Sequence, residues 1–182
     1  MELNYNIKLL EEDPSLSCVN DVNSGLLIYY LGENKKELFT GAIYEKFNNK
    51  IISEYEVKDG KKNGIQRDYF QDGKLEEISE WKENFKYGIN KEYNDEGILK
   101  GVSIVWNNDY IKIMDIEKQK VIEKKIIKKE GIPKRILYLL NLSDRKLLDY
   151  SFDMKNSSDL EEYYMNGFNS LEDHHTTRNI NL

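Results

Sequence analysis

The sequence is nearly devoid of cysteine, proline and histidine: its 182 residues include one Cys, two Pro and two His. Because Cys18 is the only thiol, no disulfide can form within the chain, which is typical of a protein from a reducing compartment. No histidine lies near Cys18 in the sequence, so we interpret it as a small buried hydrophobic residue. His174 and His175 are adjacent near the end of the sequence, and they offer neither a closed metal site nor a catalytic pair.

Long hydrophobic runs are missing too. No apolar stretch approaches the about 20 residues that span a bilayer, and the first residues lack the basic and apolar regions of a secretory signal. We therefore expect a cytoplasmic protein without a membrane partner. A composition of 39% hydrophobic and 33% charged residues suits an extended sheet with much wetted surface better than a compact globule.

Sequence signatures of enzyme chemistry are absent as well. Residues 60–64 superficially resemble a phosphate loop, but they lack the Lys-Ser/Thr ending and a following helix. The many carboxylates are spread along the expected strand faces, which favours solvated surfaces over an acid pair of the glycosidase kind. We predict no enzymatic activity, no cofactor, no bound metal and no small-molecule substrate.

Charge is distributed unevenly along a chain whose net charge is −6. This balance disfavours direct binding to nucleic-acid phosphates. Residues 71–96 contain eight acids and four lysines, whereas Lys118–Arg135 contains eight basic residues and two acids. Such a division indicates either ordinary solvated strand faces or a polarised surface that steers a charged partner.

Turn sequences recur at a nearly constant spacing. Residues 72–75 (Asp-Gly-Lys-Leu) and 96–99 (Glu-Gly-Ile-Leu) look like the same turn twice. Asp-Gly is a strong hairpin signal, because Gly adopts positive φ without steric cost. The same register gives five sites where a turn precedes an apolar residue: Lys50-Ile51, Lys74-Leu75, Ile98-Leu99, Lys120-Val121 and Lys146-Leu147. Polar and apolar residues alternate between the turns, which predicts strands with one buried face.

A series of glycines marks the opposite strand of each unit. Gly25, Gly64, Gly88 and Gly101 are each followed, five residues later, by a Tyr or a Trp. Together the two series predict a mainly β protein of tandem antiparallel β-hairpin repeats that form an extended sheet. Several units are needed, because a single hairpin cannot bury its apolar face alone.

The two ends of the chain depart from the repeat. We expect a short strand over residues 5–10 and a last strand pair at Arg135–Asn141 and Lys146–Met154. Lys120–Lys129 could be a strand or a short helix, and the turn sequence at 131–133 favours a strand. Residues 158–172 look helical, with Ser158 and Glu161 spaced as a capping box. The expected organisation is a hairpin sheet over residues 1–156, one C-terminal capping helix over 157–173 and a tail over 174–182, all in a single domain.

Several stretches resemble the bacterial variant of MORN-type repeats. They are residues 38–44 (Leu-Phe-Thr-Gly-Ala-Ile-Tyr), 58–64 (Lys-Asp-Gly-Lys-Lys-Asn-Gly), 69–75 (Tyr-Phe-Gln-Asp-Gly-Lys-Leu) and 92–97 (Glu-Tyr-Asn-Asp-Glu-Gly). Good similarity covers roughly residues 25–106, and weaker similarity extends to about residue 155. The resemblance implies a hairpin-repeat fold. Members of that family are commonly labelled antitoxins, or sit beside secreted toxins as immunity proteins, and other members have no known role. The His or Asp that often precedes the strand-opening Gly is replaced here by Asn63 or Tyr87.

From the acidic repeats and this resemblance we expect a protein that neutralises a partner protein, as an antitoxin, immunity protein or similar inhibitor. The partner would be a toxin, a nuclease or another effector, whose basic groove the acidic repeats could occupy by mimicking nucleic acid. The candidate contact residues combine acidic charge with aromatic anchors: Glu76, Glu80, Trp81, Glu83 and Tyr93. The alternation leaves open whether Trp81 belongs to the core or to an exposed binding face.

The alternative is a structural scaffold, peripheral at an anionic membrane surface. Its contacts would come from the basic segment, where each Lys or Arg near the lipid is worth about 1 kcal/mol. The candidate basic patch consists of Lys124, Lys125, Lys128 and Lys129.

Overall fold

The protein is mainly β, as the turn spacing predicted. A computed structural model describes residues 7–118, 120–126 and 131–152. Residues 7–150 belong to one compact unit, and Ser151 and Phe152 to another. The helix expected at 157–173 and the tail at 174–182 lie outside the described residues.

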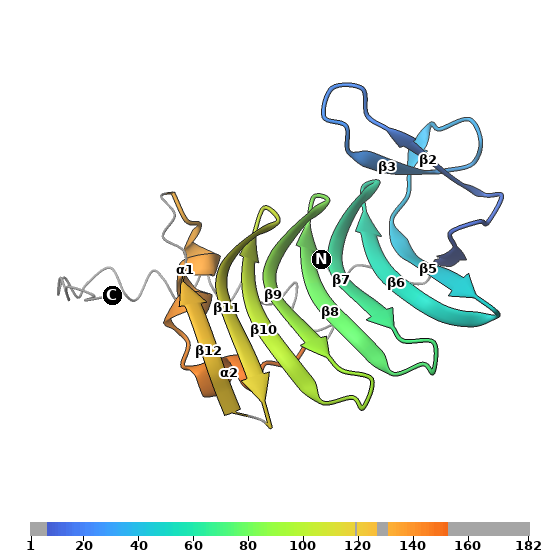
Figure 1. Ribbon diagram of the computed structural model, residues 1–182. Coiled ribbons are helices and arrows are strands. Elements are labelled where there is room, and N and C mark those ends of the chain that lie inside the picture. Colours follow the sequence, from blue (N-terminus) through green and yellow to red (C-terminus); the bar gives the residue numbers. More distant parts are fainter. Residues whose placement is uncertain (1–6, 119, 127–130, 153–182) are drawn as a thin grey trace. The chain divides into compact units, whose positions relative to one another are not determined.

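The main feature is a nine-stranded sheet made of consecutive hairpins (Figure 1). Its strands are β1 (Lys8–Leu10), β5 (Gly41–Phe47), β6 (Lys50–Lys58), β7 (Lys61–Tyr69), β8 (Leu75–Lys82), β9 (Phe85–Tyr93), β10 (Leu99–Trp106), β11 (Asp109–Glu117) and β12 (Lys120–Ile126). From β5 to β12 each strand pairs antiparallel with the next strand in the chain. Strand β1 instead pairs parallel with β5.

Hydrogen bonds between neighbouring turns recur from one hairpin to the next. The Asn84 side-chain oxygen accepts from the Lys62 amide at 2.7 Å, and the Asn108 oxygen accepts from the Lys86 amide at 2.8 Å. Each asparagine occupies the second position of a two-residue turn with positive φ, a conformation that Asn tolerates well. The side chain of one turn therefore fastens it to the preceding hairpin.

At the opposite ends of the strands, lysine side chains connect each turn to the next. Lys50 donates to the carbonyl oxygen of Gln71 at 2.8 Å. Lys74, at the equivalent place in the next hairpin, donates to the carbonyl oxygen of Asp95 at 2.6 Å. The recurrence of the same bonds confirms that the hairpins are structural repeats.

Two buried carboxylates lie inside the sheet at equivalent repeat positions. Glu56 and Glu80 each accept a hydrogen bond at 2.7 Å from the backbone amide nine residues later. The residue before that amide, Gly64 or Gly88, has φ of +124° or +115°. Gly101, which the sequence placed in the same series, lies within a strand as they do but has no positive φ. The equivalence of Gly101 to these glycines was therefore wrong.

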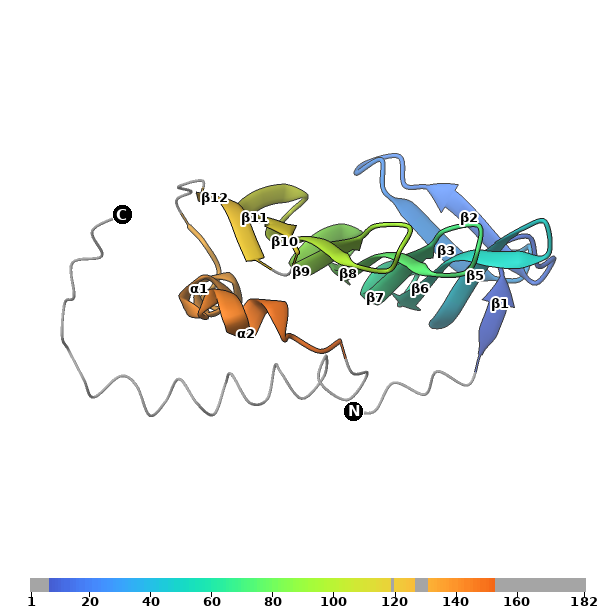
Figure 2. The same cartoon turned by 60° about the horizontal axis from the view of Figure 1, so that its bottom comes forward.

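Two short helices, α1 (Lys134–Asn141) and α2 (Asp144–Leu148), pack on one face of the sheet (Figure 2). We call it the helix face. Helix α1 buries Ile136 and Leu139, which are spaced one turn apart, and the Ser143 hydroxyl caps α2. The last pair of strands, expected over 135–141 and 146–154, is thus replaced by helices in its described part.

The helices are held to the sheet by polar contacts. Arg135 of α1 donates to the Glu80 carboxylate at 2.7 Å, and Lys112 of β11 pairs with Asp144 of α2 at 3.0 Å. Lys91 donates to the backbone carbonyl of Leu148. Sequence patterning could not indicate these contacts, because the partners lie 32 to 57 residues apart.

A separate sheet of three strands is formed by β2 (Leu16–Asn20), β3 (Leu27–Leu31) and β4 (Glu37–Leu38). The hairpin repeat predicted at Gly25 therefore does not continue the large sheet. Both sheets share a core cluster, in which the Tyr29 and Tyr55 hydroxyls lie 3.0 Å apart. Burial raises the pKa of Tyr29 to about 12.

Candidate functional site

Acidic side chains recur along a row that crosses strands β5 to β12 of the large sheet. Cross-strand pairing from β5 to β12 brings eight residues into line: Glu45, Ser53, Asp68, Glu77, Glu92, Gly101, Asp115 and Glu123. Six of the eight are acids, and we call this line the acidic row. Side chains alternate between faces, and Lys91, next to Glu92, reaches helix α2. The acidic row therefore points away from the helix face.

A second line of polar residues runs beside the acidic row on the same face. It includes Gln66, Ser79, Asn90 and Ser103. Ser79 and Asn90 are 1% exposed and Ser103 is 5% exposed. The Asn90 side-chain oxygen and the Ser103 hydroxyl have no hydrogen-bond partner among the described residues. Such buried polar atoms are rare, and they call for an explanation.

Three of the six acids in the row already have ion-pair or hydrogen-bond partners within the chain. Glu77 pairs with Lys86, Glu123 pairs with Lys125 at 3.0 Å, and Asp68 accepts hydrogen bonds from neighbouring side chains. Burial raises the pKa of the Glu45 carboxyl.

Glu92 and Asp115 differ from these residues. Neither forms an ion pair with a described residue. The Asn90 amide donates to Glu92 at 3.3 Å. Two carboxylates outside the ion pairs of the described chain thus stand on strands on either side of Gly101, although Asp115 also interacts with Lys125 and Glu123 on the neighbouring strand.

Trp81 lies on the same face, two residues after Ser79 in β8. Its indole N–H donates to the Ser79 hydroxyl at 2.9 Å, and its ring is half-buried. The Lys62 ammonium sits 4.1 Å from the centroid of the Tyr55 ring and 4.8 Å from that of Trp81. Burial lowers the pKa of Lys62. Trp81 is therefore neither a core residue nor a freely exposed anchor.

The structure does not bring the five predicted contact residues together. Glu76 is exposed in β8, and Glu83 lies in the β8–β9 turn, 3.5 Å from Lys61. Tyr93 is half-buried and, by strand alternation, falls on the helix face. Trp81 lies on the face of the acidic row.

Glu80 differs most from what the sequence suggested. We expected an exposed contact residue, and its side chain is buried at 7% exposure. Its carboxylate accepts from Arg135 at 2.7 Å and from the Tyr150 hydroxyl at 2.9 Å. Glu80 therefore secures the C-terminal helices and offers little to a partner.

The basic patch is divided by the sheet. Lys124 and Lys125 are consecutive in β12, so their side chains project from opposite faces. Lys124 lies 3.4 Å from Asp144, and Lys125 pairs with Glu123. Lys128 and Lys129 lie outside the described residues.

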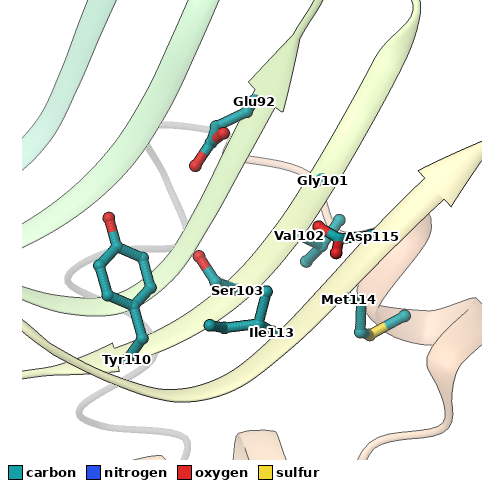
Figure 3. Close-up of a pocket in the computed structure, with 8 residues that line it drawn as sticks. All are labelled: Glu92, Gly101, Val102, Ser103, Tyr110, Ile113, Met114 and Asp115. Atoms are coloured by element: carbon teal, nitrogen blue, oxygen red, sulfur yellow. The ribbon is translucent and has the colours of Figure 1, made fainter. Parts of the chain in front are cut away.

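Gly101 opens a cavity of about 260 Å³ in the acidic row (Figure 3). Its polar lining comes from Glu92, Ser103, Tyr110 and Asp115. In Figure 3 the Ser103 hydroxyl points in the direction of the Glu92 carboxylate. Sequence patterns did not indicate these residues as a group, because only the pairing register of β9, β10 and β11 brings them together.

Other candidate chemistry is scarce within the described part of the chain. There, no three or more His, Cys, Asp or Glu side chains group as metal ligands. No described helix is long and apolar enough to cross a bilayer. Cys18 is exposed, in contrast to the buried position that we expected. The chain matches no protein-family model, and no curated protein is significantly similar to it.

Proposed function

We propose that this chain is a non-enzymatic binding module that neutralises a partner protein, as an antitoxin, immunity protein or similar inhibitor does. The partner in this proposal carries a basic active-site groove, as nucleases do. The acidic row is the observation that carries it: six carboxylates cross one face of a single sheet. The resemblance of the turn sequences to bacterial MORN-type repeats supports the same class of function.

The geometry of the row suits an elongated basic groove. Neighbouring strands lie about 4.8 Å apart, so the row places its carboxylates one or two strand spacings apart along a line. A rigid line of like charge attracts a complementary groove over long distances and raises the association rate. The hairpin repeats hold the carboxylates in place, which lowers the entropy lost on binding.

Charge reversal at Glu92 and Asp115 tests this proposal. Neither residue takes part in an ion pair with a described residue, so the double variant Glu92→Lys/Asp115→Lys removes no member of an internal salt bridge. The matched control is Asp95→Lys/Glu96→Lys, which makes the same charge change at exposed positions in the β9–β10 turn.

The assay is growth of cells that co-express the chain with each product of the genes flanking its own. We expect the native chain and the control to protect against one toxic product, and the Glu92/Asp115 variant to lose protection. The proposal fails if no flanking product is neutralised, or if both double variants protect equally well.

The scaffold alternative gains no specific support. A basic membrane-binding surface needs its lysines on one side, whereas Lys124 and Lys125 project from opposite faces of β12 and both have acidic partners.

A further inference from the structure

Gly101 interrupts the acidic row between Glu92 and Asp115, two carboxylates that form no ion pair with a described residue. It pairs with Glu92 on one side and with Asp115 on the other. Two strand spacings of about 4.8 Å put the backbones of these acids about 10 Å apart, with no side chain between them. We call the resulting cavity of about 260 Å³ the notch (Figure 3).

The floor of the notch holds a polar group without a protein partner. Ser103 lines the cavity at 5% exposure, and its hydroxyl makes no hydrogen bond to a described residue. The adjacent Asn90 oxygen, on a side chain that is 1% exposed, is also unpartnered within the described chain. Buried polar groups are normally satisfied, so a ligand with hydrogen-bond donors would complete this site.

We propose that the notch binds the guanidinium group of an arginine side chain from the protein partner. This inference rests on the proposed function and names the group that the acidic row recognises. Guanidinium is planar, carries five N–H donors and has no acceptor. The notch offers the complementary set: the carboxylates of Glu92 and Asp115 and the hydroxyl oxygen of Ser103.

Arginine fits the notch better than lysine or a metal ion. Its delocalised cation stacks on aromatic rings, and Tyr110 supplies a ring at the wall of the cavity. Its fork can donate to acceptors on two sides at once, whereas an ammonium is a compact point charge. A metal ion would be served by only two carboxylates here, and no group of three acidic or other metal-binding side chains occurs among the described residues.

Gly101 allows the notch to be filled without disturbing the backbone. Its φ is not positive, and the nearest atom to an added Cβ is the Met114 carbonyl oxygen at 3.7 Å, an ordinary contact. Gly101→Leu should therefore fold and occupy the notch. Glu92→Gln/Asp115→Asn removes the charge with little change of shape, and Asp95→Asn/Glu96→Gln is its matched control.

The experiment is a ¹H–¹⁵N NMR titration of the full chain with N-acetyl-arginine amide. We expect saturable shifts at the amides of Gly101, Ser103 and Asp115. Gly101→Leu and Glu92→Gln/Asp115→Asn should each weaken binding about tenfold or more, since hydrogen bonds to charged groups are lost. The control variant should bind as the native chain does.

Four results would overturn the inference, and three of them concern the native chain. Those three are equal binding of N-acetyl-lysine amide, shifts spread along the acidic row without saturation, and the same amides responding to calcium chloride alone. Unaltered arginine binding by Gly101→Leu with a native-like spectrum would also exclude the notch.

Failure of the notch and failure of the proposed function give different results. If Gly101→Leu still protects cells while Glu92→Lys/Asp115→Lys does not, the row binds a partner without an arginine in the notch. If arginine binds at Gly101 but no flanking gene product is neutralised, the guanidinium site is supported and the neutralising function is refuted.

Discussion

The carboxylate of Glu80 accepts a hydrogen bond from the backbone amide of Ile89 at 2.7 Å. The same bond joins Glu56 to Ile65 one repeat earlier. One repeat further on, Ile104 occupies the position of the acid and Lys112 that of the glycine. Lys112 instead pairs with Asp144 of α2. The repeat that lacks the buried acid therefore contacts the helices through Lys112.

The first prediction concerns the glycine beside each buried acid. A Cβ on Gly88 would overlap the Glu80 carboxylate, at a φ of +115°. Gly88→Ala should therefore destabilise the protein by about 3 kcal/mol, combining backbone strain with overpacking. Urea unfolding measures this. Gly101→Ala is the control, and we expect it to gain about 0.5 kcal/mol. Similar losses for both variants would contradict the difference in backbone conformation between the two glycines.

The second prediction concerns pH. Burial raises the pKa of Glu56 above its ordinary value of 4.5, although the amide of Ile65 opposes the shift. As the pH rises from about 4.5, the unfolded chain ionises at Glu56 before the folded protein does, so stability falls until the raised pKa is passed. Glu56→Gln removes this dependence and should gain stability relative to the native chain as the pH rises through this range. Unfolding free energies at several pH values test it, and a constant difference would refute it.

Glu80→Gln should behave in the opposite way. The Glu80 carboxylate binds Arg135, whose side chain is 18% exposed, and also the Tyr150 hydroxyl. Losing the charge leaves Arg135 without this carboxylate, and we expect a loss of about 3 kcal/mol at neutral pH. The contrast between two acids at equivalent repeat positions is the useful comparison. Equal effects of Glu56→Gln and Glu80→Gln on the unfolding free energy would show that the helix contact adds nothing.

A further prediction separates two buried serines. The Ser103 hydroxyl has no described partner, so Ser103→Ala should raise stability by about 1 kcal/mol. The Ser79 hydroxyl accepts from the Trp81 indole, so Ser79→Ala should lower stability by about 1 kcal/mol. Thermal unfolding in the absence of partner provides the measurement. A loss of stability in Ser103→Ala would mean that its hydroxyl is already satisfied.

The repeat architecture was predictable because it is written in local sequence. Asp72-Gly73 and the equivalent pair Glu96-Gly97 mark turns whose conformation depends on the turn residues themselves. The helix at Lys134–Asn141 also had local signals. Pro133 precedes it, and Ile136 and Leu139 follow helical spacing. We expected strands there because the register of the repeat was extended too far.

The candidate site was less accessible to sequence reasoning. Alternation indicated correctly that Glu80 and Trp81 lie on opposite faces, but not that a helix residue 55 positions away would bind Glu80. The acidic row depends on register shifts at several strand pairs, such as the one between Ser79 and Trp81. A single-residue slip would exchange the faces, so charge counts along the chain could not locate the row.

The association rate constant tests the central claim, that the acidic row meets a basic groove, most directly. It would be measured by stopped flow, at low and high salt, with whichever flanking gene product the growth assay shows to be neutralised. We predict that Glu92→Lys/Asp115→Lys lowers the rate constant about tenfold or more at low salt and flattens its salt dependence, while Asp95→Lys/Glu96→Lys stays within about twofold of the native chain. Equal rate constants for the two double variants would contradict the account.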